Sequence, residues 1–600
     1  MLHEKQTLAL ALLLAFALPV LAAETATMVP LPVSEPLAVA SPPIAEVQLA
    51  PAVPSETAAA TAPSQNVTIN LINRLVKSGA LTKEDAADLI RLAEADAAAA
   101  RAQAAAAQVP PPSDDTVRVT YIPEVVKDQI RDDLRAEVMK QAYDEKWASP
   151  RTFPTWVTNL RLFGDVRVRY QNDSFPPGND NTGGLPNFNA INTGNPFDLT
   201  GNNYPAETNA DKGRNRMRLR ARLGAEVDLG EGFTTGLRLG TGSDISPVTA
   251  NQTLGNNFGK YQVWLDRGFI KYEANCPLDT KLSATVGRFD NPFFSTKMIW
   301  ADDFGFDGAA LQAKYKGLEC VTPFLTVGAF PVFNTDFNYA GNQPAKFGSQ
   351  DKWLEGVQFG SDVKITQDWS AKGAIAYYYY QGVEGKLSSP FTPLSTADIG
   401  NTDALRPTFA QRGNTYMMLR DIVPTSANGY GTTNQFQYFG LATAFREAAL
   451  TGQIDYAGFD PCHFALTGEA VKNLAYSHSA INKIAVNNRG ADSAVGVPGS
   501  YAGGDTGWLV NLNLGNVALK KRWDWNVNVG YRYVESDAVV DGFCDSDFGG
   551  GGTNLKGFTL GGGLGLSSRV WLGAKWMSAD SIAGPTFKTD IFQFDINAKF

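Results

Sequence analysis

The sequence has few of the residues on which catalytic and metal sites depend. Its 600 residues include only 4 cysteines and 3 histidines, and no cysteine pair has C-x-x-C spacing. A zinc site and a thiol redox motif are therefore not predicted. The histidines are His3, His463 and His478, and none has the serine and acid partners expected of a Ser-His hydrolase. We predict no enzyme activity, no cofactor and no metal site.

Long apolar runs are also missing beyond the start of the chain. Residues 8–21 are apolar, follow Lys5 and precede two alanines, as is typical of a secretory signal cleaved near residue 23. A spanning helix needs about 20 apolar residues, and no later stretch provides them. Because only helices and closed barrels satisfy every backbone group in lipid, a membrane protein with this sequence is expected to be a β-barrel.

The net charge indicates an exported, acidic protein. The formal net charge is -9, which excludes a predominantly basic, nucleic-acid-binding protein. A disulfide between Cys276 and Cys320 is left open for an oxidising compartment.

The C-terminal residues alternate strictly between apolar and polar. Alternation with a period of two indicates a strand with one face in an apolar medium and the other in water. Such an ending resembles the closing strand of a bacterial outer-membrane barrel, in which the terminal aromatic, here Phe600, is read by the barrel assembly machinery. An ordinary half-buried strand of a soluble sheet would show the same alternation. The apolar positions are Phe592, Phe594, Ile596, Ala598 and Phe600.

The chain divides into four predicted parts. After the signal at 1–23, residues 24–63 are rich in proline and alanine and are predicted to form a disordered leader. Residues 64–150 show helical periodicity, and residues 155–600 show the period of strands. The fold class predicted is an all-β transmembrane antiparallel barrel of about 16 strands, preceded by a periplasmic α-helical or coiled-coil region.

The last predicted helix, from about residue 124 to 147, carries an apolar stripe that needs a partner. Another copy of the chain in a trimeric stalk and the underside of the barrel are both candidates, and a simply solvated helix is the alternative. The stripe consists of Val126, Ile130, Leu134 and Val138.

The strand pattern from residue 159 onward places charges on one face only. Residues 216–229 alternate between aliphatic side chains and a series of charged ones, chiefly arginines. So many charges on one strand face cannot lie in a packed core, but they can line a water-filled lumen while the aliphatic face contacts lipid. Tryptophans and tyrosines near strand ends, such as Trp353, Trp369, Trp508 and Trp576, suit the interfacial girdles of a barrel.

Connection lengths give a second test of the barrel. Short turns alternate with long loops, as in porin-type barrels, and the pattern predicts sixteen strands when residues 435–457 are counted as one strand after a loop tail. Counting two strands there would give eighteen. The long loops are expected near residues 172–213, 243–262, 290–305, 331–352, 382–440, 474–504, 536–554 and 579–587.

Several segments resemble the "putative porin" family of Gram-negative outer membranes. They include LTKEDAADLIRLAE, RLFGDVRVRYQ, GRFDNPFFSTKMIWADDFGFDGAALQ and TGEAVKNLAY. The resemblance extends over about residues 66–600, with the GRFDNPF stretch and the acidic segment after it as its most specific part. It implies an outer-membrane channel whose solutes the family does not define.

The third long loop, 290–305, is the candidate constriction, because in general porins this loop folds into the barrel. Its acidic residues, Asp290, Asp302 and Asp303, with Asp307 just beyond, would face a basic lumen wall and create a transverse field. A solvated or cation-binding loop, and arginines neutralised by lumen carboxylates, are the alternatives. Arg288 has the lipid-facing parity and is expected at the extracellular rim. The basic wall comprises Arg167, Arg169, Arg216, Arg218, Arg220, Arg222, Arg238, Arg267 and Lys271.

The sequence therefore predicts an outer-membrane porin for passive diffusion of small hydrophilic solutes or ions, with a weak anion preference. The expected partners are outer-membrane lipid, the barrel assembly machinery, the solutes and two further copies in a homotrimer, with peptidoglycan as a further candidate and nucleic acid excluded. The alternative is a structural anchor that tethers the envelope through its periplasmic helices and has a filled lumen.

Overall fold

The computed structural model describes a few helical residues and nearly all of the barrel. The described residues are 86–89, 91–92, 95, 98–99, 137–138, 140, 159–200, 205–277, 279–494 and 497–600. The chain separates into two compact units, Met1–Gln129 and Ile130–Phe600. The described residues between 86 and 99, in the first unit, are helical, as are 137, 138 and 140 in the second. The predicted signal, leader and remaining helical segments lie outside the described residues.

Within the part of the chain that the structure describes, no helix is long and apolar enough to cross a membrane.

Sixteen antiparallel strands form the barrel in the second unit, as predicted. The two-residue strand β5 (Gln252–Thr253) adds a pairing to β3 without crossing the barrel wall. The sixteen are β1 (Leu160–Ser174), β3 (Arg214–Gly230), β4 (Phe233–Gly240), β6 (Trp264–Cys276), β7 (Thr280–Asp290), β8 (Gly305–Tyr315), β9 (Val321–Phe333), β10 (Lys352–Lys364), β11 (Trp369–Gln381), β15 (Arg446–Phe459), β16 (Cys462–Asn473), β17 (Thr506–Asn516), β18 (Trp525–Val534), β19 (Leu555–Gly565), β20 (Val570–Ser581) and β21 (Lys588–Lys599).

The first and last strands close the ring. β1 pairs with β3 on one side and with β21 on the other, with Val166 opposite Ala598 and Tyr170 opposite Phe594. Beyond the last ladder pair, Gly164 and Phe600 exchange two backbone hydrogen bonds, each of 3.0 Å. Closure leaves neither β1 nor β21 as an unpaired edge, which the lipid environment requires.

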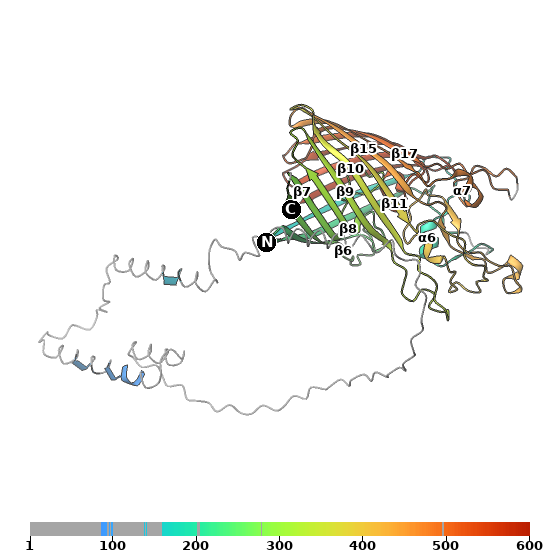
Figure 1. Ribbon diagram of the computed structural model, residues 1–600, viewed down its shortest axis with the longest axis horizontal. Helices are drawn as coiled ribbons and strands as arrows, with labels where there is room; N and C mark the ends of the chain where they lie inside the picture. Colours follow the sequence, from blue (N-terminus) through green and yellow to red (C-terminus); the bar gives the residue numbers. More distant parts are fainter. Residues whose placement is uncertain are drawn as a thin grey trace, which may run out of the picture. The chain divides into compact units, whose positions relative to one another are not determined.

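All short turns lie at one end of the barrel and all long loops at the other. Figure 1 shows the long loops together with α6 (Phe188–Thr193) and α7 (His478–Ile484) at the end opposite the C-terminus. Residues 435–457, for which the sequence allowed either one strand or two, contain one barrel strand, which begins at Arg446. The residues before it form β13 (Phe436–Gln437) and β14 (Phe439–Leu441), which pair with other loop strands instead. The count of sixteen rather than eighteen is confirmed.

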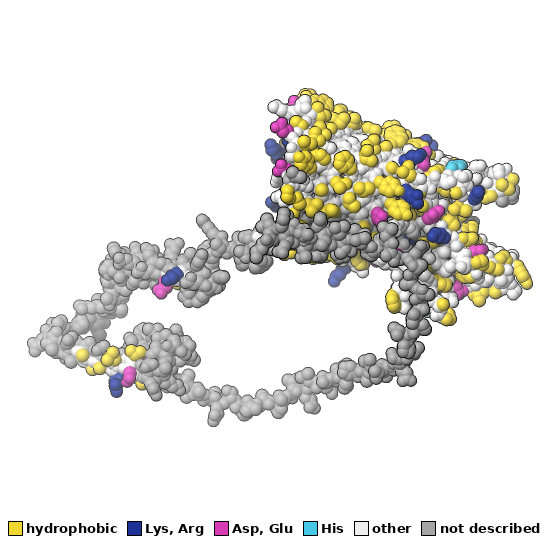
Figure 2. Space-filling model, in the orientation of Figure 1, with side chains coloured by type: hydrophobic (Ala, Val, Ile, Leu, Met, Phe, Trp, Pro, Cys, Tyr) yellow, Lys and Arg dark blue, Asp and Glu magenta, His cyan; other side chains and the backbone are white. Residues whose placement is uncertain are grey.

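Alternation within the strands explains which side chains face outward. In β3 the side chains of Met217 and Leu223 are exposed, while the arginines between them occupy the opposite, lumen face. Figure 2 shows hydrophobic side chains gathered over the visible strand wall, with charged side chains mainly toward its margins. The outward surface therefore matches lipid, and the polar residues of each strand are turned toward the lumen.

The long loops are tied together by a buried polar network around Asp537. Its carboxylate accepts hydrogen bonds from the backbone N–H and hydroxyl of Thr415, at 2.8 and 2.6 Å, from the Tyr501 hydroxyl at 2.6 Å and from Ser536 at 2.8 Å. These residues come from three different long loops, so one carboxylate holds the loops against each other. Full satisfaction of its oxygens offsets the cost of burying it.

All four cysteines are free thiols, so the disulfide left open between Cys276 and Cys320 is not formed in this structure.

Closure of the ring depends on a glycine at position 164. A Cβ atom there would lie 2.5 Å from the Phe600 ring and 2.6 Å from the backbone oxygen of Arg222. We expect Gly164→Val to displace the C-terminal residue and to destabilise the barrel by about 1–3 kcal/mol, the usual cost of overpacking. The measurement is the urea midpoint of unfolding, followed by the heat-modifiable gel mobility of the refolded protein.

Gly452→Val is the matched control, because Gly452 also lies in a barrel strand but, apart from its chain neighbours, no described residue has an atom within 4 Å of an added Cβ. Equal destabilisation by both substitutions would contradict the role given to the contact between Gly164 and Phe600.

Candidate functional site

The loop between β7 and β8, residues 291–304, runs across the inside of the barrel; we call it the infolded loop. Its Phe294 exchanges two backbone hydrogen bonds with the Gln358 side chain of β10, at 2.7 and 2.8 Å. Farther along, the N–H of Thr296 donates to Glu469 of β16 at 2.9 Å, and the Thr296 hydroxyl donates to the same carboxylate. The loop thus reaches a wall five strands away from β8 in the sheet.

Apolar packing fills the lumen on one side of this loop. Trp300 stacks edge-on against Phe306 of β8 and Tyr378 of β11, with ring centroids 4.8 and 5.4 Å apart. Phe293 likewise meets Tyr378 at 5.1 Å. The loop residues Met298 and Ile299 are almost completely buried in the same cluster. The wall formed by β8–β11 is therefore covered, and polar space is left toward the other strands.

On the opposite side, the infolded loop is joined to β1 and β3 by charged groups. Asp303 Oδ1 lies 3.0 Å from Arg220 and 3.2 Å from Arg222, and both arginines also contact Asp165 of β1. Burial raises the pKa of the Asp303 carboxyl, but Arg220 and Arg222 outweigh it and hold that pKa below its ordinary value. Asp303 is therefore ionised at neutral pH.

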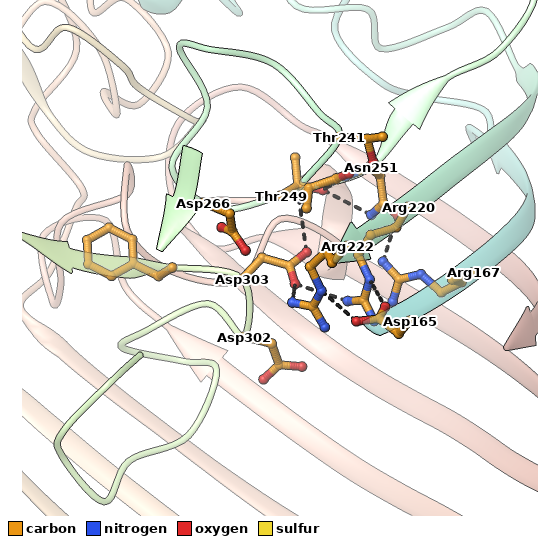
Figure 3. A network of polar contacts seen from close by, with 12 residues as sticks. Asp165, Arg167, Arg220, Arg222, Thr241, Thr249, Asn251, Asp266, Asp302 and Asp303 are labelled. Carbon is orange, nitrogen blue, oxygen red and sulfur yellow. Dashed lines mark hydrogen bonds and ion pairs between the residues drawn. The ribbon is translucent and has the colours of Figure 1, made fainter. Parts of the chain in front are cut away.

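The sequence predicts an acidic loop that faces a basic wall across the lumen, whereas in the structure the acidic and basic groups are in direct contact. Figure 3 shows Asp303 pointing toward Arg220 and Arg222, whereas Asp302 lies apart from them. Asp302 pairs instead with Lys297, another residue of the infolded loop. Of the two neighbouring aspartates, the structure brings only Asp303 onto the arginine wall.

Arg167 and Arg218 differ from their neighbours because neither has an ion-pair partner among the described residues. Arg167 donates to Asn251 Oδ1 at 2.6 Å, and Arg218 donates to Gln171 Oε1 at 3.3 Å. The Nε atoms of both, like that of Arg216, are buried without a hydrogen-bond partner among the described residues. Arg216, in contrast, is paired with Asp173 at 2.5 Å.

Arg169 is the most deeply buried arginine of the predicted wall. It contacts Asp547 at 3.0 Å and Asp595 at 2.7 Å. Asp547 also lies 3.4 Å from Lys575, so the group is locally neutral. The sequence analysis did not identify these partners of Arg169. Lys575 and Asp595 could have been found, because each has the alternation that places it on the lumen face of β20 or β21. Asp547 lies in a loop, where no such alternation exists.

Arg238, Arg267 and Asp290 form a second charged group, and Arg267 also donates to the backbone oxygens of Asp303 and Phe304 at the end of the infolded loop. Asp290 lies at the end of β7 and contacts Arg238 at 3.0 Å and Arg267 at 2.7 Å. Asp266 binds the same two arginines, at 2.6 and 2.8 Å. Lys271 lies four residues beyond Arg267 in β6 and is paired with Glu273 at 2.7 Å.

Asp307 does not join the predicted acidic group. It pairs with Arg288 at 2.7 Å, at the long-loop ends of β7 and β8, away from the arginines of β1 and β3. Strand parity turns Asp307 away from the packed Phe306 and toward Arg288, and this ion pair lines the outer cavity rather than joining Arg220 and Arg222.

Three cavities follow one another through the barrel. The outer cavity, of about 620 Å³, lies on the long-loop side of the infolded loop; the central cavity holds about 300 Å³ and the inner cavity about 570 Å³. The outer and central cavities share Asp303 and Thr249, and the central and inner cavities share Arg220 and Trp571. Neighbouring cavities therefore adjoin each other at these shared residues.

Charge changes sign along these cavities. The outer cavity is lined by five acidic and two basic residues, Asp244, Asp266, Asp303, Asp307, Asp541, Arg288 and Lys352. The central cavity has five of each kind, Arg167, Arg169, Arg220, Lys297, Lys575, Asp302, Asp303, Asp545, Asp547 and Asp595. The inner cavity has seven basic and three acidic residues, Arg161, Arg220, Arg222, Arg238, Arg267, Lys271, Lys599, Asp165, Glu226 and Asp290.

No group of three or more His, Cys, Asp or Glu side chains within the described residues could hold a metal ion. His463 contacts Asp455 at 2.8 Å beside a short turn, and His478 contacts the backbone oxygen of Tyr501.

Glu469 is expected to hold the infolded loop in place. Its carboxylate accepts from Thr296 and also from Thr451, at 2.8 Å, so Glu469→Ala leaves several buried donors unpaired. Leaving a buried donor unpaired costs about 1–3 kcal/mol. We expect the variant to fold but to show larger current fluctuations in single-channel recordings, because the loop moves in the lumen.

Glu319→Ala is the control, since Glu319 is exposed in the short turn between β8 and β9. A Glu469→Ala channel as quiet as both the control and the unaltered protein would show that apolar packing alone fixes the loop.

The solved structures to which this chain is similar have low sequence identity to it. OprB of Pseudomonas putida at high pH is 13% identical, with a TM-score of 0.39, over 74% of this chain and 95% of its own. The outer membrane channel DcaP of Acinetobacter baumannii is 10% identical, with a TM-score of 0.34, over 74% and 97%. OmpF of Salmonella typhi, in complex with daunomycin, is 9% identical, with a TM-score of 0.33, over 74% and 97%.

None of the curated proteins matches this chain. A family model described as "putative porin" matches residues 65–600, which is most of the chain and all of the barrel. The resemblance seen in the sequence is confirmed: the chain belongs to the putative porin family.

Proposed function

We propose that this protein is an outer-membrane channel through which small hydrophilic solutes and ions diffuse passively. The observation that carries the proposal is the series of three cavities, which share lining residues and contain many charged groups. Barrels of about 16 strands are wide enough to leave an aqueous path. Membership of the putative porin family supports the same function.

The narrowest part of the path is proposed to lie at the central cavity, which is the smallest of the three. One wall there is the cluster of Asp303, Arg220 and Asp165. Another wall, on β19 and β20, includes Gly561 and Gly573, which have no side chains to obstruct the lumen. Solutes would pass between charged groups and a wall of small residues.

A weak anion preference is proposed on two grounds. Arg167, which lines the central cavity, has no ion-pair partner among the described residues, and the inner cavity has seven basic residues against three acidic ones. Charged rings of one sign in a channel favour ions of the opposite sign. Asp303 works against this preference, because its negative charge lies at the boundary of the central cavity.

We further propose a homotrimer embedded in outer-membrane lipid and inserted by the barrel assembly machinery, which would read Phe600. The location of residues 64–150 in the periplasm, their contact with peptidoglycan and the anchor function rest on the sequence alone. A structural anchor needs no continuous polar path, and the cavities therefore favour the channel.

Single-channel recordings of the refolded protein under a KCl gradient test both parts of the proposal. We expect discrete ohmic current steps and a reversal potential whose sign shows that anions are more permeant than cations. A unit charge at ~4 Å in water is worth about 1 kcal/mol, or roughly five-fold in ion occupancy. Arg167→Gln is therefore expected to lower the anion-to-cation permeability ratio by up to this factor, and Asp303→Asn is expected to raise it.

Lys483→Gln serves as the charge-matched control, because Lys483 is exposed in α7 and lines none of the three cavities. A folded, heat-modifiable barrel with no conductance would overturn the channel and favour the anchor.

A further inference from the structure

The outer cavity is large enough to hold a small organic molecule rather than only ions. Its volume of about 620 Å³ lies within the range of ordinary small-molecule sites. Four long loops contribute to it, among them the infolded loop through Phe304, the loop before β6 through Thr249, and two others through Phe409 and Phe543. It is therefore enclosed from several sides, above the point where the path narrows.

The wall of this cavity is partly apolar. Phe543 stacks on Tyr380 and Trp300 at 6.2 Å and lies against the buried core, and Phe409 packs on the same core. Both rings are only partly buried, and both line the cavity. An apolar group of a solute placed there would leave water, a gain that a simple hydrophilic pore does not offer.

The charged groups of the outer cavity leave carboxylates, not cations, available to a solute. The ammonium group of Lys352 already donates to the backbone oxygens of Leu405 and Arg406, at 3.0 and 2.8 Å, and Arg288 is paired with Asp307. Asp541, in contrast, is buried and its Oδ2 has no hydrogen-bond partner among the described residues. Asp244 is exposed and its carboxylate contacts only the neighbouring Ser243.

Burial raises the pKa of Asp541 to about 7. A cationic group beside this carboxylate would favour its ionised form, because an opposite charge nearby stabilises the charged state.

The central cavity provides positively charged side chains. Where the outer and central cavities meet, at Asp303 and Thr249, the path reaches Arg167 and Arg220. Among the described residues, the hydrogen-bond partner of the Arg167 side chain is the amide oxygen of Asn251, so the guanidinium can still bind a carboxylate. A solute that lies across this boundary meets carboxylates and aromatic rings at one end and arginine at the other.

We propose that the outer and central cavities together bind amphipathic zwitterions, of which α-amino acids with large apolar side chains are the simplest. The ammonium group lies near Asp541 and Asp244, the apolar side chain lies on Phe409 and Phe543, and the carboxylate lies toward Arg167. Binding at this place orients the solute before it enters the narrow part of the path. The inference rests on the proposed channel function, because binding is measured through the current.

The test is block of the open-channel current by phenylalanine, added on the long-loop side to a channel already conducting KCl at neutral pH. Three analogues each lack one feature: 3-phenylpropionate lacks the ammonium group, phenethylamine lacks the carboxylate and alanine lacks the aromatic ring. We expect phenylalanine to block at a concentration several-fold lower than any analogue.

Two variants locate the block. Asp244→Asn and Phe409→Ala are each expected to raise the blocking concentration of phenylalanine several-fold while the KCl conductance shows that the barrel is folded. Asp492→Asn is the matched control, since Asp492 is an equally exposed loop carboxylate that does not line the outer cavity, and it is expected to leave the block unchanged.

Normal KCl conductance with equal block by all four compounds, or with no block, overturns this inference and leaves the channel function standing. Loss of the block in Asp492→Asn as well would also overturn it, because the effect would then follow general loop charge. Absence of KCl conductance from the folded protein overturns the channel, and this inference with it.

Discussion

The structure depends on one constraint, that no backbone N–H or C=O can be left unpaired in lipid. Sixteen strands meet it only because β1 and β21 join, and this joint ends in the mutual hydrogen bonds of Gly164 and Phe600. Once the ring is closed, alternation along each strand turns every second side chain inward. The arginines of β3 can then avoid lipid only by occupying the lumen, where they need water or carboxylates.

The lumen is asymmetric because the infolded loop is amphipathic. Its aromatic and aliphatic residues pack on Phe306 and Tyr378, which removes one side of the lumen from water. Its one carboxylate on the other side, Asp303, is held by Arg220 and Arg222. Apolar packing and ion pairing thus act on opposite sides of the same loop, and together they confine the polar path to the side of β1, β3 and β18–β21. The change from acidic to basic lining along this path follows from where the loops and strands end.

Much of the barrel could be predicted from the sequence, because its pattern is local. A period of two and the alternation of short and long connections need no knowledge of distant residues, and they led to sixteen strands and to the lumen parity of Arg216–Arg222.

The site was harder to predict. The residues Tyr377–Tyr380 are apolar on both faces, so their sequence does not reveal that Tyr378 packs against the infolded loop. Asp302 and Asp303 are adjacent and identical in type, yet they bind different partners, which depends on the loop conformation. Asp307 lines the outer cavity with Asp303, but it is paired with Arg288 rather than with the arginines of β3.

The sequence by itself determined the strands, their order and the side of the sheet on which each charge lies, because these follow from local periodicity and from the connections between neighbouring strands. Only the tertiary structure decided which charges meet and which stay free, because Asp303 and Arg220 are 83 residues apart and Arg169 and Asp595 are 426 apart. Such pairs form when the ring closes and the loop folds inward. No local pattern contains them, since the ion pairs and the cavities arise from the packing of segments that are distant along the chain.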